Sequence, residues 1–157
     1  MFIITDKPLT VAEVEAAVAR PDAGAIVTFQ GVVRDNNLGK QVSYLVYEAY
    51  PPMAEKVMAQ IGDEIAERWP GARTAIAHRV GQLEIGEASV IIAVSTGHRA
   101  DAFAACHYAI DRLKAIVPVW KKEVWEGGAY WIEGSAPASE GEAEAVQRLD
   151  WNDPGSS

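Results

Sequence analysis

Two lysines on either side of a proline are the residues of this sequence best suited to chemistry. Lys114 falls at the edge of the apolar face of a predicted helix, and Lys121 follows on a predicted strand beyond Pro118. A reversal of the chain between helix and strand would bring both ammonium groups into one pocket. Each charge would then lower the pKa of the other amine, which suits a general acid, a general base or a nucleophile. The structural alternative is that Lys114 only extends along the rim of the core to reach water.

Three further cationic residues flank predicted strands and could bind an anion. Arg34 opens a polar loop, and His98 and Arg99 lie between a buried strand and the start of a helix. A helix N-terminus favours anions, and a guanidinium can pair with two oxygens of a phosphate or carboxylate. The alternative is that both arginines are solvated loop charges. Lys122 should point to the opposite face of the strand from Lys121. A substitution of Lys122 is therefore the natural control for substitutions of the lysine pair.

Other reactive residue types are better explained by packing. Cys106 lies on the apolar face of the second main helix, where a thiol is small and inert, although a sulfur-carrying nucleophile is the alternative. A single cysteine forms neither an internal disulfide nor a CxxC site. His78 and His107 have no partners at metal-ligand spacing, so no metal site is expected.

Composition and charge narrow the class of protein. The chain has 157 residues, 49% of them hydrophobic and 23% charged, which are the proportions of one globular domain. The formal net charge of −8 disfavours a general nucleic-acid binder but allows a small basic pocket. No apolar run reaches the length of a membrane span, and the N-terminus lacks the pattern of a signal peptide. We therefore expect a cytoplasmic protein that binds neither nucleic acid nor a membrane.

The hydrophobic pattern predicts an α+β fold. Strands are expected over 2–5, 25–33, 42–49, 75–83, 88–95, 119–124 and 129–132, with 88–95 central. The last two form a hairpin across Gly127-Gly128. A short helix should follow a capping box at Thr10 and Glu13. Two main helices, over 51–69 and 102–116, should bury apolar stripes that include Met53 and Phe103 respectively.

A series of motifs runs in one order from about Gly24 to Ile132. The motifs are Phe29-Gln-Gly-Val-Val-Arg34 with Asn37-Leu-Gly39, Tyr47-Glu-Ala-Tyr50 with Met53-Ala54 and Lys56, His78-Arg-Val-Gly81, Gly86-Glu87, His98-Arg99 with Ala102-Phe103, Asp111-Arg-Leu-Lys114, and Pro118-Val-Trp-Lys-Lys-Glu123. The set resembles the MoaE family, the large, catalytic subunit of molybdopterin synthase. The last two motifs are the most specific.

The resemblance implies a fold, an activity and partners. The family fold is an α/β hammerhead with an additional α+β subdomain, so a mixed, mainly antiparallel sheet packed by two main helices is expected. The implied sulfurtransferase installs a dithiolene in cyclic pyranopterin monophosphate, giving molybdopterin, within molybdenum cofactor biosynthesis. Sulfur is supplied as a thiocarboxylate on the C-terminal Gly-Gly tail of a small ubiquitin-like partner, MoaD. The resemblance also implies a homodimer within a heterotetramer. It implies that the reaction uses no metal or organic cofactor.

The resemblance also assigns site residues, position by position. It implies that Lys114 and Lys121 are catalytic. It implies substrate-binding roles for Val32, Val33, Arg34, His98, Arg99, Lys122 and Glu123. Both reactants are anionic, which agrees with a cationic cleft. The sequence departs from the family pattern in segment 134–136, which has no charged residue. In the family pattern, a basic residue just after the last strand would reach the pocket of the neighbouring subunit.

We expect a single catalytic domain over residues 1–133 and an acidic, partly flexible tail over 134–157. Two other functions remain open. One is a non-catalytic module that binds a ubiquitin-like partner or a pterin phosphate. Anion binding alone, however, does not require two lysines close together in space. A phosphate-ester hydrolase ranks last, because the sequence shows neither paired carboxylates nor a metal cluster.

Overall fold

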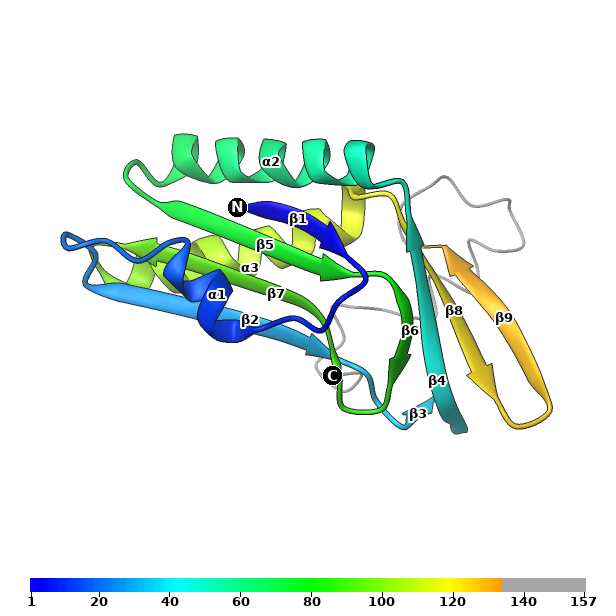
Figure 1. Ribbon diagram of the computed structural model, residues 1–157. Helices are drawn as coiled ribbons and strands as arrows, with labels where there is room; N and C mark the ends of the chain where they lie inside the picture. The colour runs from blue at the N-terminus through cyan, green and yellow to red at the C-terminus, as the bar shows by residue number, and fades with distance from the viewer. Residues whose placement is uncertain (134–157) are drawn as a thin grey trace.

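The structure, a computed structural model, describes residues 1–133, and the predicted acidic tail over 134–157 lies outside the described residues. Figure 1 shows two sheets and the helices that cover one of them. In chain order the elements are β1 (Phe2–Thr5), α1 (Val11–Ala16), β2 (Ala25–Val32), β3 (Asn36–Asn37), β4 (Lys40–Ala49), α2 (Pro51–Arg68), β5 (Arg73–Arg79), β6 (Gly81–Glu84), β7 (Ala88–Thr96), α3 (Arg99–Ile116), β8 (Val119–Trp125) and β9 (Gly128–Glu133).

The first sheet has the strand order β1-β5-β7-β2, and its only parallel pair is β1 with β5. Alternate residues of β7 enter different cores, because successive side chains of a strand point to opposite faces. Ile92 and Val94 pack with residues of α2 and α3, whereas Ile91 and Ala93 pack with Val14 near α1. This burial on both faces explains the continuous apolar sequence of β7 and confirms its predicted central position.

The second sheet has the order β3-β4-β8-β9, and β6 also pairs with β4. The single strand expected over 75–83 is in fact two strands, which belong to different sheets. The break falls at Gly81, whose φ of +93° is a conformation that glycine adopts without strain. The corner therefore carries the chain from one sheet to the other. The α+β prediction, with mainly antiparallel pairing, is confirmed.

The helices are close to their predicted positions, but two predicted core residues are exposed. Met53 in α2 is 54% exposed and Phe103 in α3 is 63% exposed. The buried face of α2 instead contains Ala54 and Met58, and that of α3 is largely alanine. In α3 the prediction followed a large apolar residue, whereas the helix packs on the sheet largely through alanines. In α2 the buried face also contains the large residues Ile61 and Ile65, but it includes Ala54 and Met58 rather than Met53. No helix in the described part of the chain is long and apolar enough to cross a membrane.

Two local predictions also need correction. Thr10 is the N-cap residue of α1, but its side chain makes no capping hydrogen bond, so the capping box is not formed. The β8–β9 hairpin turns at Glu126-Gly127 rather than Gly127-Gly128, because Trp125 pairs with Gly128. Gly127 supplies the positive φ, +90°, that this turn requires.

The reversal expected between Lys114 and Lys121 is present. Helix α3 ends at Ile116, and its C-cap Val117 has an extended backbone with ψ of 122°. Pro118 then lacks the amide hydrogen needed to continue a helix, and β8 begins at Val119. The chain thus leaves the last turn of α3 and enters a strand of the other sheet within three residues.

Candidate active site

A pocket lies where the C-terminal end of α3 meets strands of both sheets. Lys114 and Lys121 both line it, as does Arg34, so the predicted convergence of these three cations is confirmed. The polar side chains of the lining are Arg34, Asn36, Asn37, Tyr47, His78, Ser89, Lys114, Lys121 and Glu123. Apolar residues, among them Phe29 and Leu113, complete the walls. A pocket of this kind concentrates positive charge in a partly dry environment.

The amine of Lys114 has a pKa well below that of an ordinary lysine. Its pKa is lowered to about 8, first by burial, then by the charges of Lys121 and Arg34, against the opposing effect of Asp111. Burial disfavours the charged form, and nearby like charges do the same. A pKa near 8 leaves Lys114 able both to donate and to accept a proton close to neutral pH.

Lys121 enters the pocket from β8, and the register of that strand decides which of its neighbours join it. Lys121 pairs with Tyr47 and Glu123 with Leu45 across the β4–β8 ladder, so they share a face, and Lys122 lies on the other. Burial and the charge of Arg34 lower the pKa of Lys121, whereas Glu123 raises it. The predicted effect of the lysine pair therefore holds for Lys114, but the charges acting on Lys121 are those of Glu123 and Arg34.

Lys122 is not brought into the pocket. Its Nζ lies 5.6 Å from the centroid of the Trp131 ring on the neighbouring strand β9. This confirms the predicted opposite orientation of the two adjacent lysines. A substrate-binding role for Lys122 finds no support in its position.

Glu123 is held in place by Asn37, to which the sequence motifs gave no role of its own. The Asn37 amide nitrogen donates a 2.6 Å hydrogen bond to Glu123 Oε1, and both side chains are buried. The two residues are 86 positions apart in the sequence, so no local pattern could reveal the contact. The bond fixes the carboxylate beside Lys121.

Arg34 is positioned by an irregularity at the end of β2. The β2–β7 register shifts between Gly31 and Val32, at the predicted glycine interruption. A Cβ at Gly31 would lie 2.8 Å from a methyl carbon of Val90, so this close approach requires glycine. Val33 then exchanges backbone hydrogen bonds with the β6–β7 turn, through Glu87 O at 3.0 Å and Gly86 N at 2.8 Å. These contacts aim the following residue, Arg34, at the pocket.

The two predicted valines have different surroundings. Val32 is 52% exposed and lines the pocket, whereas Val33 is buried in the small core between β4 and β6. Only Val32 can present its side chain to a ligand there.

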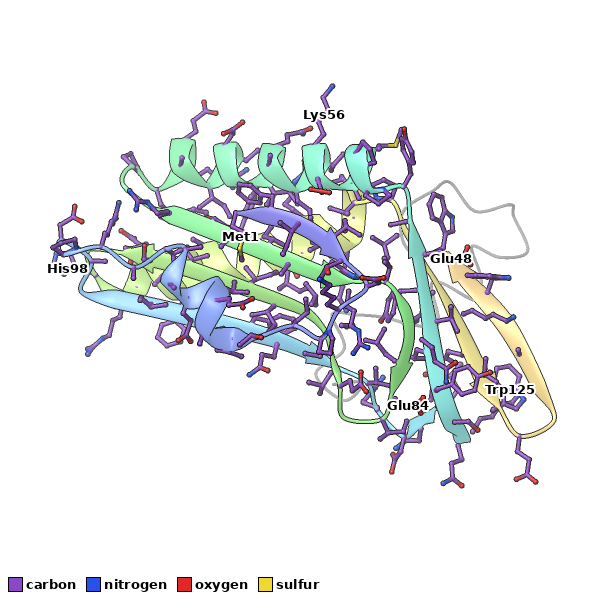
Figure 2. All side chains as sticks on the ribbon, in the orientation of Figure 1. Met1, Glu48, Lys56, Glu84, His98 and Trp125 are labelled. Carbon is purple, nitrogen blue, oxygen red and sulfur yellow. The ribbon has the colours of Figure 1, made fainter. Side chains whose placement is uncertain are left out.

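His98 and Arg99 are not in the pocket of their own chain. They occupy the N-cap and first residue of α3, and both are exposed. Lys114 lies in the last turn of that helix, whose 18 residues span about 27 Å. Figure 2 shows His98 at one end of the molecule and Trp125, on the β8–β9 hairpin, at the other. One chain therefore does not combine these two residues with the lysine pair.

Cys106 shows none of the features of a reactive thiol. It is buried in the core, and burial raises its pKa to about 11. A thiol with such a pKa is protonated near neutral pH and is a poor nucleophile. Its expected packing role is confirmed. Within residues 1–133, no group of three or more His, Cys, Asp or Glu side chains could hold a metal ion.

The sequence and the fold are both similar to those of known proteins. Residues 4–116 match the sequence model of the family described as MoaE protein. A molybdopterin synthase catalytic subunit from Halalkalibacterium halodurans is 57% identical over 131 residues, which cover 83% of this chain and 84% of that protein. The crystal structure of molybdopterin synthase from Staphylococcus aureus aligns with a TM-score of 0.81 at 51% identity, over 83% of this chain and 95% of that one.

A more distant neighbour has the same fold. It is a chain of the complex of subunits 1 and 2 of molybdopterin-converting factor from Helicobacter pylori, with a TM-score of 0.69 at 22% identity, over 85% of this chain and 92% of that one. The family match covers well over half of the sequence, and the relatives match along most of their own length. The chain belongs to the MoaE family.

Proposed function

We propose that this chain is the catalytic subunit of a molybdopterin synthase, a sulfurtransferase that forms the dithiolene of molybdopterin from cyclic pyranopterin monophosphate. The observation that carries the proposal is the meeting of Lys114, Lys121 and Arg34 in one pocket of a chain that belongs to the MoaE family. Two anionic reactants, a cyclic phosphate and a thiocarboxylate, must approach each other in such a reaction. Fixed positive charge stabilises that approach, at about 3 kcal/mol for each well-placed donor.

The two lysines have different environments, which suit different roles. Lys121 is partly buried, and the neighbouring Glu123 favours its charged form, so it positions or protonates the oxygens that leave the substrate. Lys114 has a pKa of about 8, so it orients the incoming sulfur donor and serves as an acid, a base or a covalent helper while sulfur attacks the side-chain carbons of the pterin. Two rounds, each with a fresh donor, deliver the two sulfurs.

His98 and Arg99 belong to the site only if a second copy of the chain supplies them. Both are exposed at the far end of α3, and both offer hydrogen-bond donors to an anion. In a homodimer, an end of one molecule can meet the pocket of the other. We include these residues as substrate-binding groups in that arrangement, and Arg34 as the phosphate contact within the same chain.

The sulfur donor in this proposal is a small ubiquitin-like protein that carries a thiocarboxylate on a C-terminal Gly-Gly tail. A tail without side chains can enter a narrow pocket, and its terminal anion matches the three cations there. The complete assembly would be a heterotetramer in the cytoplasm, with one donor bound to each copy of the catalytic subunit.

Reconstitution tests the proposal directly. The purified chain is mixed with a thiocarboxylated ubiquitin-like partner and cyclic pyranopterin monophosphate, and the dithiolene product is measured. Turnover is expected. Binding of the partner or the pterin without product would favour the non-catalytic module, and phosphate release in the absence of the sulfur donor would favour a hydrolase.

A further inference from the structure

The pocket contains a histidine to which no role has yet been given. His78 lies on β5, is only 4% exposed, and lines the same pocket as Lys114 and Lys121. Arg34 and the two lysines of the lining can only donate hydrogen bonds, and the Glu123 carboxylate, which is an acceptor, already receives the Asn37 amide through Oε1. A substrate with donors of its own therefore benefits from a further acceptor here.

The tautomer of His78 is fixed by its neighbour. Its Nδ1 lies 2.8 Å from the backbone oxygen of Arg79. A carbonyl oxygen only accepts hydrogen bonds, so Nδ1 must carry the proton in this contact. In a neutral ring, Nε2 then has the lone pair and can only accept. Within residues 1–133 the Nδ1 contact is the one hydrogen bond of this ring, so Nε2 is available to a ligand.

The ring is neutral and rigidly held. Burial lowers the pKa of His78 to about 4, so the imidazole is uncharged at neutral pH despite its contact with a carbonyl oxygen. The Tyr47 ring packs edge-on against it, with centroids 5.1 Å apart and an interplanar angle of 68°. The ring is therefore fixed on one side by the Arg79 oxygen and packed on another by Tyr47.

We propose that Nε2 of His78 accepts a hydrogen bond from a ring N–H or amino group of the substrate's fused heterocycle, and that it thereby selects a pterin among anionic compounds. The inference rests on the proposed function, since it concerns the substrate of that same pocket. Cations alone recognise any phosphate, whereas a pterin also presents N–H donors, which need an acceptor in the pocket wall. His78 is then a substrate-binding residue that acts on affinity rather than on the chemical step.

Two substitutions separate the acceptor from the packing of the ring. His78→Asn keeps an amide near the Nδ1 position, so the contact with Arg79 O can persist, but nothing replaces Nε2. His78→Gln is longer and places an amide oxygen near the Nε2 position. The wild type and both variants are compared for turnover with the thiocarboxylated partner, for the Kd of cyclic pyranopterin monophosphate and for the Kd of inorganic phosphate. Thermal unfolding shows whether each variant is folded.

We expect His78→Asn to raise the KM and Kd for the pterin about tenfold, the effect of one lost hydrogen bond, while kcat and the Kd for phosphate change less than twofold. His78→Gln should recover most of the affinity. Unchanged pterin affinity in a folded His78→Asn variant, or equal loss of affinity for pterin and phosphate, overturns the inference. Wild-type protein that binds pterin without turnover would refute the proposed function but leave the acceptor role measurable. Wild-type protein that does not bind pterin refutes both.

Discussion

Burial lowers the pKa of Lys114, and the charge of Lys121 lowers it further, although Lys114 belongs to helix α3 and Lys121 to strand β8. The proximity depends on the short reversal at Val117 and Pro118, which joins α3 directly to β8. Like charges repel in a partly buried site, so this arrangement is unfavourable until an anion enters. The pocket therefore exchanges some stability of the free protein for affinity toward negatively charged reactants.

Replacing Lys114 by methionine should stabilise the free protein. The folded-state pKa is about 8 and the ordinary value is 10.5, so the unfolded chain binds more protons between these pH values. Stability of the wild type therefore rises as the pH increases from about 8 to 10.5, and below pH 8 the full penalty is present. We expect Lys114→Met to raise the free energy of unfolding by roughly 1 kcal/mol at pH 7, as found for other functional sites with strained charges.

Denaturant unfolding at pH 7 and at pH 10 measures this difference. The advantage of Lys114→Met should shrink at pH 10, where the wild-type amine has already lost its proton. Lys122→Met is the matched control, since Lys122 lies outside the pocket, and it should give no such pH-dependent gain. A gain from Lys114→Met that is equal at both pH values would exclude charge repulsion as its cause.

The bond between Asn37 and Glu123 should contribute strongly to stability. Asn37→Ala leaves a buried carboxylate without its donor, so we expect the free energy of unfolding to fall by about 2 kcal/mol. The adjacent Asn36 is exposed, and its side chain donates to the neighbouring Asp35 carboxylate, so Asn36→Ala should change stability by less than about 0.5 kcal/mol. Chemical denaturation of both variants makes the comparison. An equal change in the free energy of unfolding for both variants would show that the buried bond does not stabilise the protein more than the exposed one.

Subunit mixing tests whether His98 and Arg99 act across a dimer. Lys114→Ala and Arg99→Ala chains, each inactive alone, are unfolded together in equal amounts and refolded with the sulfur donor. If Arg99 acts in the pocket of the other copy, half of the dimers are mixed and each contains one intact site, so about a quarter of wild-type turnover should return. If Arg99 acts within its own chain, every site carries a defect and no turnover returns.

The arrangement of the strands and of the lysine pair was largely predictable from the sequence, because both depend on local patterns. Alternating and continuous apolar runs located the strands, and Pro118 marked the reversal that brings Lys114 and Lys121 together. The period of two along β8 correctly separated Lys121 from Lys122. In each case a short stretch of sequence contains the physical cause.

The remaining parts of the site depend on contacts between distant residues. The partner of Glu123 is Asn37, from a two-residue strand that the sequence suggested was a loop. His78 lacked metal-ligand partners, and no pattern showed that its strand would end beside the lysines. The exposure of Phe103 was missed because helix α3 packs through alanines, which weigh little in a hydrophobic stripe. The grouping of His98 and Arg99 with the pocket presumed a nearness that one chain does not provide.

The most direct test of this account is dithiolene formation by Lys114→Ala and Lys122→Ala, each supplied with preformed thiocarboxylated partner and cyclic pyranopterin monophosphate. Lys114→Ala should lose at least about 100-fold in kcat, as expected when a charged group acts at the reacting atoms. Lys122→Ala should remain within about threefold of the wild type, since its amine lies over Trp131 on the other face of β8. Near-normal turnover by Lys114→Ala, or an equal loss in both variants, would contradict the assignment of catalysis to this pocket.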